Sequence, residues 1–195
     1  MSLPHALLGL IHYGPAAGYD LKARFRESIY FFWNATLPQI YRTLGKMEAN
    51  GWVASTVEHQ DGKPSRKVYR VSEAGEKEFE RWLAEPPEAP APRVPMLIKA
   101  FFGARLPRSR FLEQIKKVRE YHARLLGKYE KEIAPQIEEH SHRVGSGEDA
   151  NFWRLTLDYG RRHAQMTVDW CDAVLKGINE AQKREGQDGG FSSRS

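Results

Sequence analysis

The sequence predicts a mainly α-helical protein with a small β-hairpin wing: a winged helix-turn-helix domain followed by a C-terminal domain of long, coiled-coil-like helices. Three observations lead to this fold class. Apolar residues recur with a helical period over the first 50 residues, and the period changes to two between residues 52 and 71. In the second half of the chain, apolar residues step by three and four, after a proline-rich segment at residues 85–95.

The composition excludes several classes of protein. The 195 residues are 41% hydrophobic and 28% charged, which is typical of a soluble globular protein. No apolar run approaches the roughly 18 residues that a membrane span needs, and no signal peptide pattern is present, so we expect a cytoplasmic protein without a membrane partner. Cys171 is the only cysteine, which excludes an intramolecular disulfide and a cysteine zinc site. Residues 1–72 contain nine lysines and arginines against five acidic residues, which points to a polyanionic partner.

The first two helices are predicted at residues 3–13 and 18–30. In the first, five leucine and isoleucine residues share one broad face, and Gly14 followed by Pro15 ends the helix. In the second, apolar residues repeat every four positions and form one stripe. Helices this short are not stable alone, so we expect both to pack with a third helix into a helix-turn-helix core.

The third helix, residues 36–50, is the one around which the first domain is organised. Its apolar residues follow a 3.6-residue period and line a face that we expect to be buried. Thr36 and Gln39 have the spacing of a capping box, and Pro38 lies in the first turn, where its missing N–H is harmless. The sequence therefore predicts a well-defined amphipathic helix.

The polar face of this helix predicts a recognition helix. It carries side chains that hydrogen-bond base edges or phosphates, and it includes no acidic residue. The residues predicted to read bases are Gln39, Arg42, Thr43 and Lys46, and Tyr41 is predicted to contact phosphate. The alternative for this stretch alone is an ordinary amphipathic helix with a solvated polar face.

A β-hairpin is predicted next, from residues 52–58 and 66–71, because both runs are rich in β-branched and aromatic residues. The segment between them contains Asp61-Gly62-Lys63-Pro64, which is typical of a turn. The tip and the return strand carry four cations, Lys63, Arg66, Lys67 and Arg70. We predict a wing that contacts the DNA backbone through Lys63, Arg66 and Lys67. The alternative is an edge strand protected by charge.

A capped helix and the proline-rich segment close the first domain. Ser72 caps a helix over residues 73–84, in which Leu83 and two aromatic residues are expected to face inward. The five prolines of residues 85–95 form a stiff connector. We therefore place a winged-helix DNA-binding domain at residues 1–84 and a linker at residues 85–95.

The second domain is predicted to be a helical dimerisation domain over residues 96–185. After a short apolar helix, a long helix begins at Pro107 and ends or kinks at Pro135, and a last helix spans residues 150–183. Both long helices carry an apolar repeat close to 3.5 residues, the spacing of a coiled-coil seam, which in the last helix includes Phe152, Tyr159 and Met166. Two helices cannot bury this much apolar surface against each other, so we expect a second copy related by a twofold axis. Residues 186–195 are expected to be a disordered tail.

No pattern typical of an enzyme or of a cofactor site is present. The sequence lacks a phosphate loop, a dinucleotide-binding glycine pattern, a zinc-protease motif and a nucleophile elbow, so we predict neither catalysis nor a cofactor. His140 and His142 would point apart on a helix, which argues against a metal site. Five aromatic residues of the second half either belong to the core or line an effector pocket between subunits: Phe101, Phe102, Trp153, Tyr159 and Trp170.

Several short motifs follow one another in order through residues 1–80. They include Leu7-Leu8-Gly9-Leu10, Gly18-Tyr19-Asp20-Leu21, Gln39-Ile40-Tyr41, Gly51-Trp52-Val53 and Gly62-Lys63-Pro64. In this order they resemble the PadR family of transcriptional regulators, and residues 93–103 are similar to the start of the longer C-terminal domain of its virulence-activator subgroup. Arg42 stands where the family usually has proline, which adds a cation to the DNA-facing side.

The resemblance implies a dimeric winged-helix DNA-binding protein, more often a repressor than an activator, and several family members respond to phenolic acids or other small hydrophobic compounds. We therefore expect a homodimeric regulator of transcription that inserts two recognition helices into the major groove of a roughly palindromic operator. A small aromatic effector is a possible further partner. The alternatives are a winged-helix and coiled-coil protein-interaction adaptor that does not bind DNA, and an enzyme acting on a small aromatic molecule.

Overall fold

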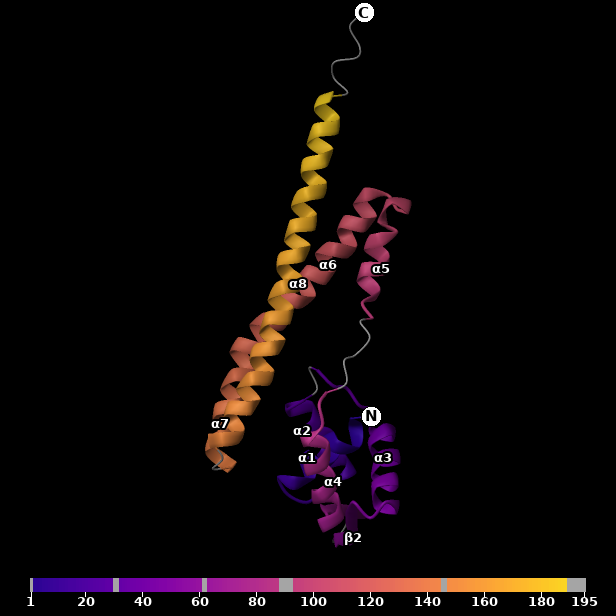
Figure 1. Cartoon of the computed structure of the whole chain (residues 1–195), viewed down its shortest axis with the longest axis vertical. Helices are drawn as coiled ribbons and strands as arrows, with labels where there is room; N and C mark the ends of the chain where they lie inside the picture. The colour runs from indigo at the N-terminus through magenta and orange to yellow at the C-terminus, as the bar shows by residue number, and fades with distance from the viewer. Residues whose placement is uncertain (1, 30–31, 61–62, 88–92, 145–146, 189–195) are drawn as a thin grey trace, which may run out of the picture. The chain divides into compact units, whose positions relative to one another are not determined.

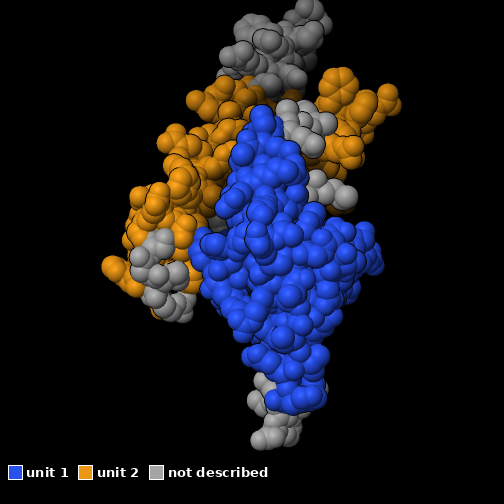
Figure 2. All heavy atoms as spheres, turned by 60° about the horizontal axis from the view of Figure 1, so that its bottom comes forward, with its two compact units in different colours: residues 1–91 blue, residues 92–195 orange. Residues whose placement is uncertain are grey.

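The structure, a computed structural model, describes residues 2–29, 32–60, 63–87, 93–144 and 147–188. The chain forms two compact units, Met1–Ala91 and Pro92–Ser195, shown in blue and orange in Figure 2. The division falls within the proline-rich segment. Of the hairpin turn expected at residues 61–64, residues 61–62 lie outside the described residues, whereas Lys63 and Pro64 belong to a strand. Residues 88–92 of the expected linker also lie outside the described residues.

The described residues of unit 1 form four helices and a small antiparallel sheet (Figure 1). The elements in chain order are α1 (Leu3–His12), β1 (Ala16–Ala17), α2 (Gly18–Glu27), α3 (Leu37–Ala49), β2 (Val53–Gln60), β3 (Lys63–Val71) and α4 (Glu73–Ala84). The winged helix-turn-helix arrangement predicted from the periodicity is confirmed. The observed α2 ends three residues before its predicted end at residue 30.

The core of unit 1 forms where the apolar stripes of α1, α2 and α3 meet. Fully buried side chains come from all three helices: Leu7, Leu8, Leu21, Phe25, Ile40, Leu44 and Met47. On α3 the buried positions are the predicted ones, except that Leu37 is only half-buried and Tyr41 is 48% exposed. Full burial of a side chain of this size stabilises the fold by about 1.5 to 3 kcal/mol, so these contacts fix which face of α3 points inward.

The sheet has the order β1-β3-β2, and its first strand was not predicted. β1 has two alanines and therefore no detectable period, and it is a strand only because Ala16 and Ala17 pair with Tyr69 and Val68 of β3. The hairpin strands β2 and β3 are longer than predicted, and their register shifts between Glu58 and Gln60. The wing is thus paired along both edges of its return strand.

Helix α4 closes unit 1 by packing on α1. The ring of His5 is stacked on Trp82, with ring centroids 4.6 Å apart, and its Nε2 lies 2.9 Å from Oε1 of Glu78. Leu83, which we expected to face inward, is 60% exposed, because the buried face of α4 is formed by Gly75 and the two aromatic residues instead.

Unit 2 consists almost entirely of helix (Figure 1). Its elements are α5 (Pro95–Phe101), the 3₁₀ turn η1 (Gly103–Arg105), α6 (Arg108–Lys128), the π-helical turn η2 (Tyr129–Ile133), α7 (Ala134–Val144) and α8 (Gly147–Asp188). The interruption expected at Pro135 takes the form of the π turn just before it, since proline cannot donate to the carbonyl four residues back. α8 extends to Asp188, so residues 186–188 are helical rather than part of the tail, and residues 189–195 lie outside the described residues.

Helices α6 and α8 lie side by side, but α8 does not use the predicted seam for this contact (Figure 1). We expected its apolar repeat to run through Phe152, Tyr159 and Met166. These side chains are 62%, 70% and 56% exposed. The buried face of α8 consists instead of smaller side chains and one leucine: Ala150, Leu157, Ala164, Thr167, Val168 and Cys171. Small residues allow the backbones of α6 and α8 to approach closely. The exposed and the buried side chains together show that α8 has two apolar faces, of which one is buried among the described residues.

Within the described residues, no helix combines the length and the apolar character that crossing a membrane requires.

Gly75 provides a test of the packing between the wing and α4. A Cβ atom at this position would lie 2.0 Å from the backbone oxygen of Trp52, which cannot move freely. We expect Gly75→Ala to lower the free energy of unfolding by about 3 kcal/mol, at the upper end of overpacking costs. Urea denaturation followed by circular dichroism measures this effect. Gly45→Ala is the matched control, because a Cβ there meets no atom within 4 Å and should stabilise α3 by about 0.5 to 1 kcal/mol.

Candidate nucleic-acid interface

The first turn of α3 is held by a reciprocal cap. Oε1 of Gln39 accepts hydrogen bonds from the backbone N–H of Thr36 at 2.8 Å and from its hydroxyl at 2.9 Å, and the N–H of Gln39 points back to Oγ1 of Thr36 at 3.4 Å. The predicted capping box is therefore present. Its consequence for the site is that the carbonyl end of Gln39 is occupied in the free protein, whereas its amide NH₂ still provides donors.

The outward face of α3 carries the predicted polar residues. Gln39, Arg42 and Lys46 are exposed, and Thr43 is half-buried beside the core. Among the described residues, no ion pair involves Arg42 or Lys46. The only acidic residue of the helix, Glu48, is half-buried and turned towards the wing. The outward face of α3 therefore presents two unpaired cations and a polar amide to solvent.

Tyr41 lies at the junction of α3 and α2. Its ring packs against Gly18, the first residue of α2, where a Cβ atom would approach the ring to 2.4 Å. The side chain is still 48% exposed. Glycine at position 18 thus lets Tyr41 lie flat across the start of α2 with part of its ring accessible, an arrangement that a phosphate contact would require.

The cations of the wing are arranged differently from our expectation. Nζ of Lys67 donates to Oε2 of Glu48 at 2.7 Å, and Nε of Arg66 donates to Oε2 of Glu58 at 2.9 Å. Arg66 also reaches Asp20 of α2, with 3.5 Å between the nearest atoms. The side chain of Lys63 lies outside the described part of the structure. Two of the three cations that we assigned to phosphate therefore already have acidic partners within unit 1.

The pair between Glu48 and Lys67 is charged at neutral pH. The hydrogen bond from Lys67, together with one from Ser55, holds the pKa of the Glu48 carboxyl below its ordinary value. The hydrogen bond to Glu48 raises the pKa of Lys67 above its ordinary value. Both side chains are partly exposed, so the solvent screens this pair.

Arg70 is a wing cation to which the sequence analysis assigned no role. It is exposed on β3 opposite Ala54, and no ion pair involves it among the described residues. The signal that could have singled it out is its position in the same cationic strand, but only the structure distinguishes an unpaired arginine from a paired one.

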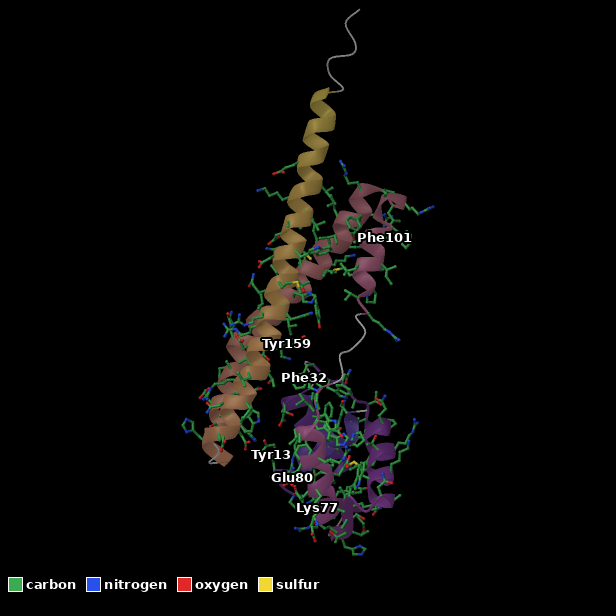
Figure 3. The ribbon with its side chains drawn as sticks, viewed as in Figure 1. Tyr13, Phe32, Lys77, Glu80, Phe101 and Tyr159 are labelled. Carbon is green, nitrogen blue, oxygen red and sulfur yellow. The ribbon has the colours of Figure 1, made fainter. Side chains whose placement is uncertain are left out.

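The five aromatic residues assigned to an effector pocket do not converge within the chain. Figure 3 shows Phe101 on α5 and Tyr159 on α8, and these side chains are 82% and 70% exposed. Phe102 is 56% exposed, and Trp153 and Trp170 are half-buried. The interpretation as core does not hold within the chain for the three exposed residues, Phe101, Phe102 and Tyr159. A hollow in unit 2 lies between α7 and α8 and is lined by other residues, among them Ile137, Glu138 and Arg154.

Metal binding finds no support in the described part of the chain. Within it, no group of three or more His, Cys, Asp or Glu side chains is placed to hold an ion. The half-buried ring of His140 lies 5.2 Å from that of Trp153, centroid to centroid.

Two family profiles match the sequence, one in each unit. The profile of the transcriptional regulator PadR-like family matches residues 7–81, and that of the virulence activator alpha C-terminal domain matches residues 92–179. The chain is 31% identical to the negative transcriptional regulator PadR of Bacillus subtilis over 186 residues, which cover 91% of this chain and 98% of that protein. It is 50% identical to a probable transcriptional regulator of Mycobacterium tuberculosis over 86 residues, 44% of this chain and 46% of that protein.

Solved structures show the same fold. Bacillus subtilis PadR in complex with operator DNA covers 91% of this chain and 99% of its own, with a TM-score of 0.75 and 24% identity. The same protein in complex with p-coumaric acid gives a TM-score of 0.70 at 23% identity, over 92% of this chain and 99% of its own. The Vibrio cholerae virulence activator AphA has a TM-score of 0.72 and 27% identity, over 92% of this chain and 99% of its own.

Proposed function

This chain belongs to the PadR-like family of transcriptional regulators, and we propose that it regulates transcription as a homodimer that binds a roughly palindromic operator in double-stranded DNA. The observation that carries the proposal is the outward face of α3, which presents Gln39, Arg42 and Lys46 with no acidic side chain among them. A helix fits the major groove, where such donors hydrogen-bond base edges.

We assign the main base contact to Arg42. Its guanidinium is exposed and has no ion-pair partner among the described residues, so both of its donor edges are available for the two acceptors of guanine. Gln39 would have to release its cap to present both a donor and an acceptor to adenine. Lys46 and the half-buried Thr43 add further contacts in the groove. We assign phosphate contacts to Tyr41, Lys63 and Arg66. Arg66 must first release the carboxylate of Glu58 before it can bind a phosphate.

The exposed face of α8 supports the homodimer. Phe152, Leu155, Tyr159 and Met166 are all more than half exposed and recur at helical spacing, and we name these four residues the α8 stripe. Large apolar side chains gathered on one face of a helix mark an interaction surface in soluble proteins. A second copy related by a twofold axis would cover both stripes at once and would set the distance between the two recognition helices.

We further propose repression rather than activation, and control by a small aromatic acid. The relative from Bacillus subtilis that aligns over nearly the whole chain is a negative regulator, and its solved structures include a complex with p-coumaric acid. In this chain, aromatic side chains of unit 2 that are open to solvent, such as Phe101 and Tyr159, provide surfaces on which an aromatic acid can stack once two copies assemble.

Arg42→Ala and Lys63→Ala should affect DNA binding in different ways. Loss of Arg42 should cost about 1 to 3 kcal/mol at one base pair and relax specificity there, because a base contact is removed. Loss of Lys63 should weaken binding to all sequences alike and flatten the salt dependence by about one unit of slope. The measurement is fluorescence anisotropy with an operator selected from a random duplex pool. Identical sequence profiles for the two variants would contradict the assignment of Arg42 to a base and Lys63 to a phosphate. If the unaltered protein bound no duplex at about 50 mM salt, the alternative of a protein-interaction adaptor that does not bind DNA would be favoured.

Negative charges placed in the α8 stripe test whether it forms the dimer interface. Tyr159→Glu together with Met166→Glu should reduce the mass in solution from twice 22.4 kDa to 22.4 kDa, because two carboxylates per copy would be buried at the interface. Light scattering coupled to gel filtration reports this mass. Lys176→Glu, on α8 outside the stripe, is the control and should leave the dimer intact. A double variant that remained dimeric would exclude the stripe as the interface.

Control by an aromatic acid is tested by adding p-coumaric acid to the operator complex. The expected result is release of the operator, because a ligand that binds better to the DNA-free form shifts the population towards it. Hexanoic acid has the same charge but no ring, and should have no effect. Equal responses to the two acids would mean that the aromatic surfaces are not the site.

A further inference from the structure

We infer that Glu48 and Lys67 are positioning residues that fix the wing to the recognition helix, and that Lys67 is not a phosphate contact. The inference rests on the DNA binding proposed above and revises one of the assignments made from the sequence. It depends on three features of unit 1: the contacts of one carboxylate, the two faces of the hairpin, and the cations that remain without partners.

A single carboxylate joins the last turn of α3 to both strands of the wing. Oε2 of Glu48 accepts from Nζ of Lys67 on β3 at 2.7 Å, and Oε1 accepts from Oγ of Ser55 on β2 at 2.5 Å. The Lys67 ammonium also lies 5.4 Å from the centre of the Tyr69 ring, within the range of a cation–π contact. The two carboxylate oxygens are therefore each used, and each strand has its own bond to the helix.

The register of the hairpin puts these groups on one face of the sheet. Ser55 pairs with Tyr69, and Lys67 lies two residues before Tyr69, so all three side chains point to the same side. Tyr69 is 5% exposed and belongs to the core of unit 1. On the other face, Arg66 reaches Asp20 of α2. The wing is thus held from both sides, by α3 through Lys67 and by α2 through Arg66.

The electrostatic state of Lys67 explains why it is a poor candidate for a phosphate contact. A phosphate would have to displace a hydrogen-bonded carboxylate and would leave Glu48 without its cation. Lys46 has no such cost, because it is exposed and no ion pair involves it among the described residues. We therefore expect Lys67 to position the wing and Lys46 to contact DNA.

Fixing the wing matters for specificity because the wing and α3 contact different parts of the duplex. A helix in the major groove and a hairpin on the backbone bind together only if the distance and angle between them match the DNA. Glu48 sits at the end of α3 closest to the wing, where a fixed contact constrains that angle most directly. Loss of the contact should weaken the operator complex without removing a charge from the DNA interface.

The test compares three variants of the full chain on operator DNA over a range of salt concentrations. Lys63→Met, at the wing residue that we assigned to a phosphate, should flatten the plot of log affinity against log salt by about 0.9, the value for one phosphate contact. Lys67→Met should lower operator affinity about two- to fivefold, as expected for a partly exposed ion pair, and should leave the slope unchanged. The charge-swapped variant, Glu48→Lys with Lys67→Glu, keeps the net charge and should restore the affinity to within about twofold.

The outcomes separate this inference from the proposed function. A slope for Lys67→Met that falls as much as that for Lys63→Met would make Lys67 a phosphate contact and overturn the inference. Failure of the charge swap, in a variant whose circular dichroism and melting temperature match the unaltered protein, would do the same. If the unaltered protein bound no DNA, the proposed function would fail, whatever the variants did.

A second measurement needs no DNA. The Glu48 carboxyl carbon, followed by NMR, should titrate with a pKa below that of an ordinary glutamate. Lys67→Met should move this pKa upward, and Lys46→Met should not change it. A Glu48 titration that does not respond to Lys67→Met would show that the two side chains are not paired in solution, and the inference would be withdrawn.

Discussion

The burial of one face of α3 is the constraint on which the rest of unit 1 depends. Ile40, Leu44 and Met47 are completely buried in the core of unit 1, and turning the helix about its axis would expose all three. The cost of that exposure is several kcal/mol, far more than any single polar contact on the surface supplies. Arg42 and Lys46 therefore point outward because the core leaves them no other direction, and the DNA-binding face follows from packing rather than from electrostatic attraction.

The distribution of charge within unit 1 matters more than its total. The excess of lysines and arginines over residues 1–72 indicated a polyanionic partner, but part of that excess is compensated locally. Lys67 is paired with Glu48, and Arg66 with Glu58 and Asp20. These pairs use the wing's cations to hold the wing in place. Among the described residues, Arg42 and Lys46 of α3 and Arg70 of β3 are exposed and have no acidic partner, so the cations free to bind DNA differ from those that position the wing.

Unit 2 illustrates a limit of periodicity. α8 contains two apolar repeats on different faces, and both have the spacing of a coiled-coil seam. The larger residues of the α8 stripe dominate the pattern, whereas the face that packs on α6 consists mainly of small residues such as Ala164 and Cys171. By hydrophobicity alone, the face of the α8 stripe ranks higher than the face that packs on α6. Close approach of two helix backbones favours the face with small residues. A count of apolar residues does not reveal a shape requirement of this kind.

Local patterns in the sequence predict the helices of unit 1, the hairpin, the cap of α3 and the residues of its outward face, because these features depend on contacts within a few positions along the chain. Three other features become visible only in the folded chain: the strand β1, the partner of Lys67 and the buried face of α8. Lys67 and Glu48 are 19 residues apart, and Arg66 and Asp20 are 46 apart. Nothing local specifies such pairs, since they form only after the core has brought α2, α3 and the wing together.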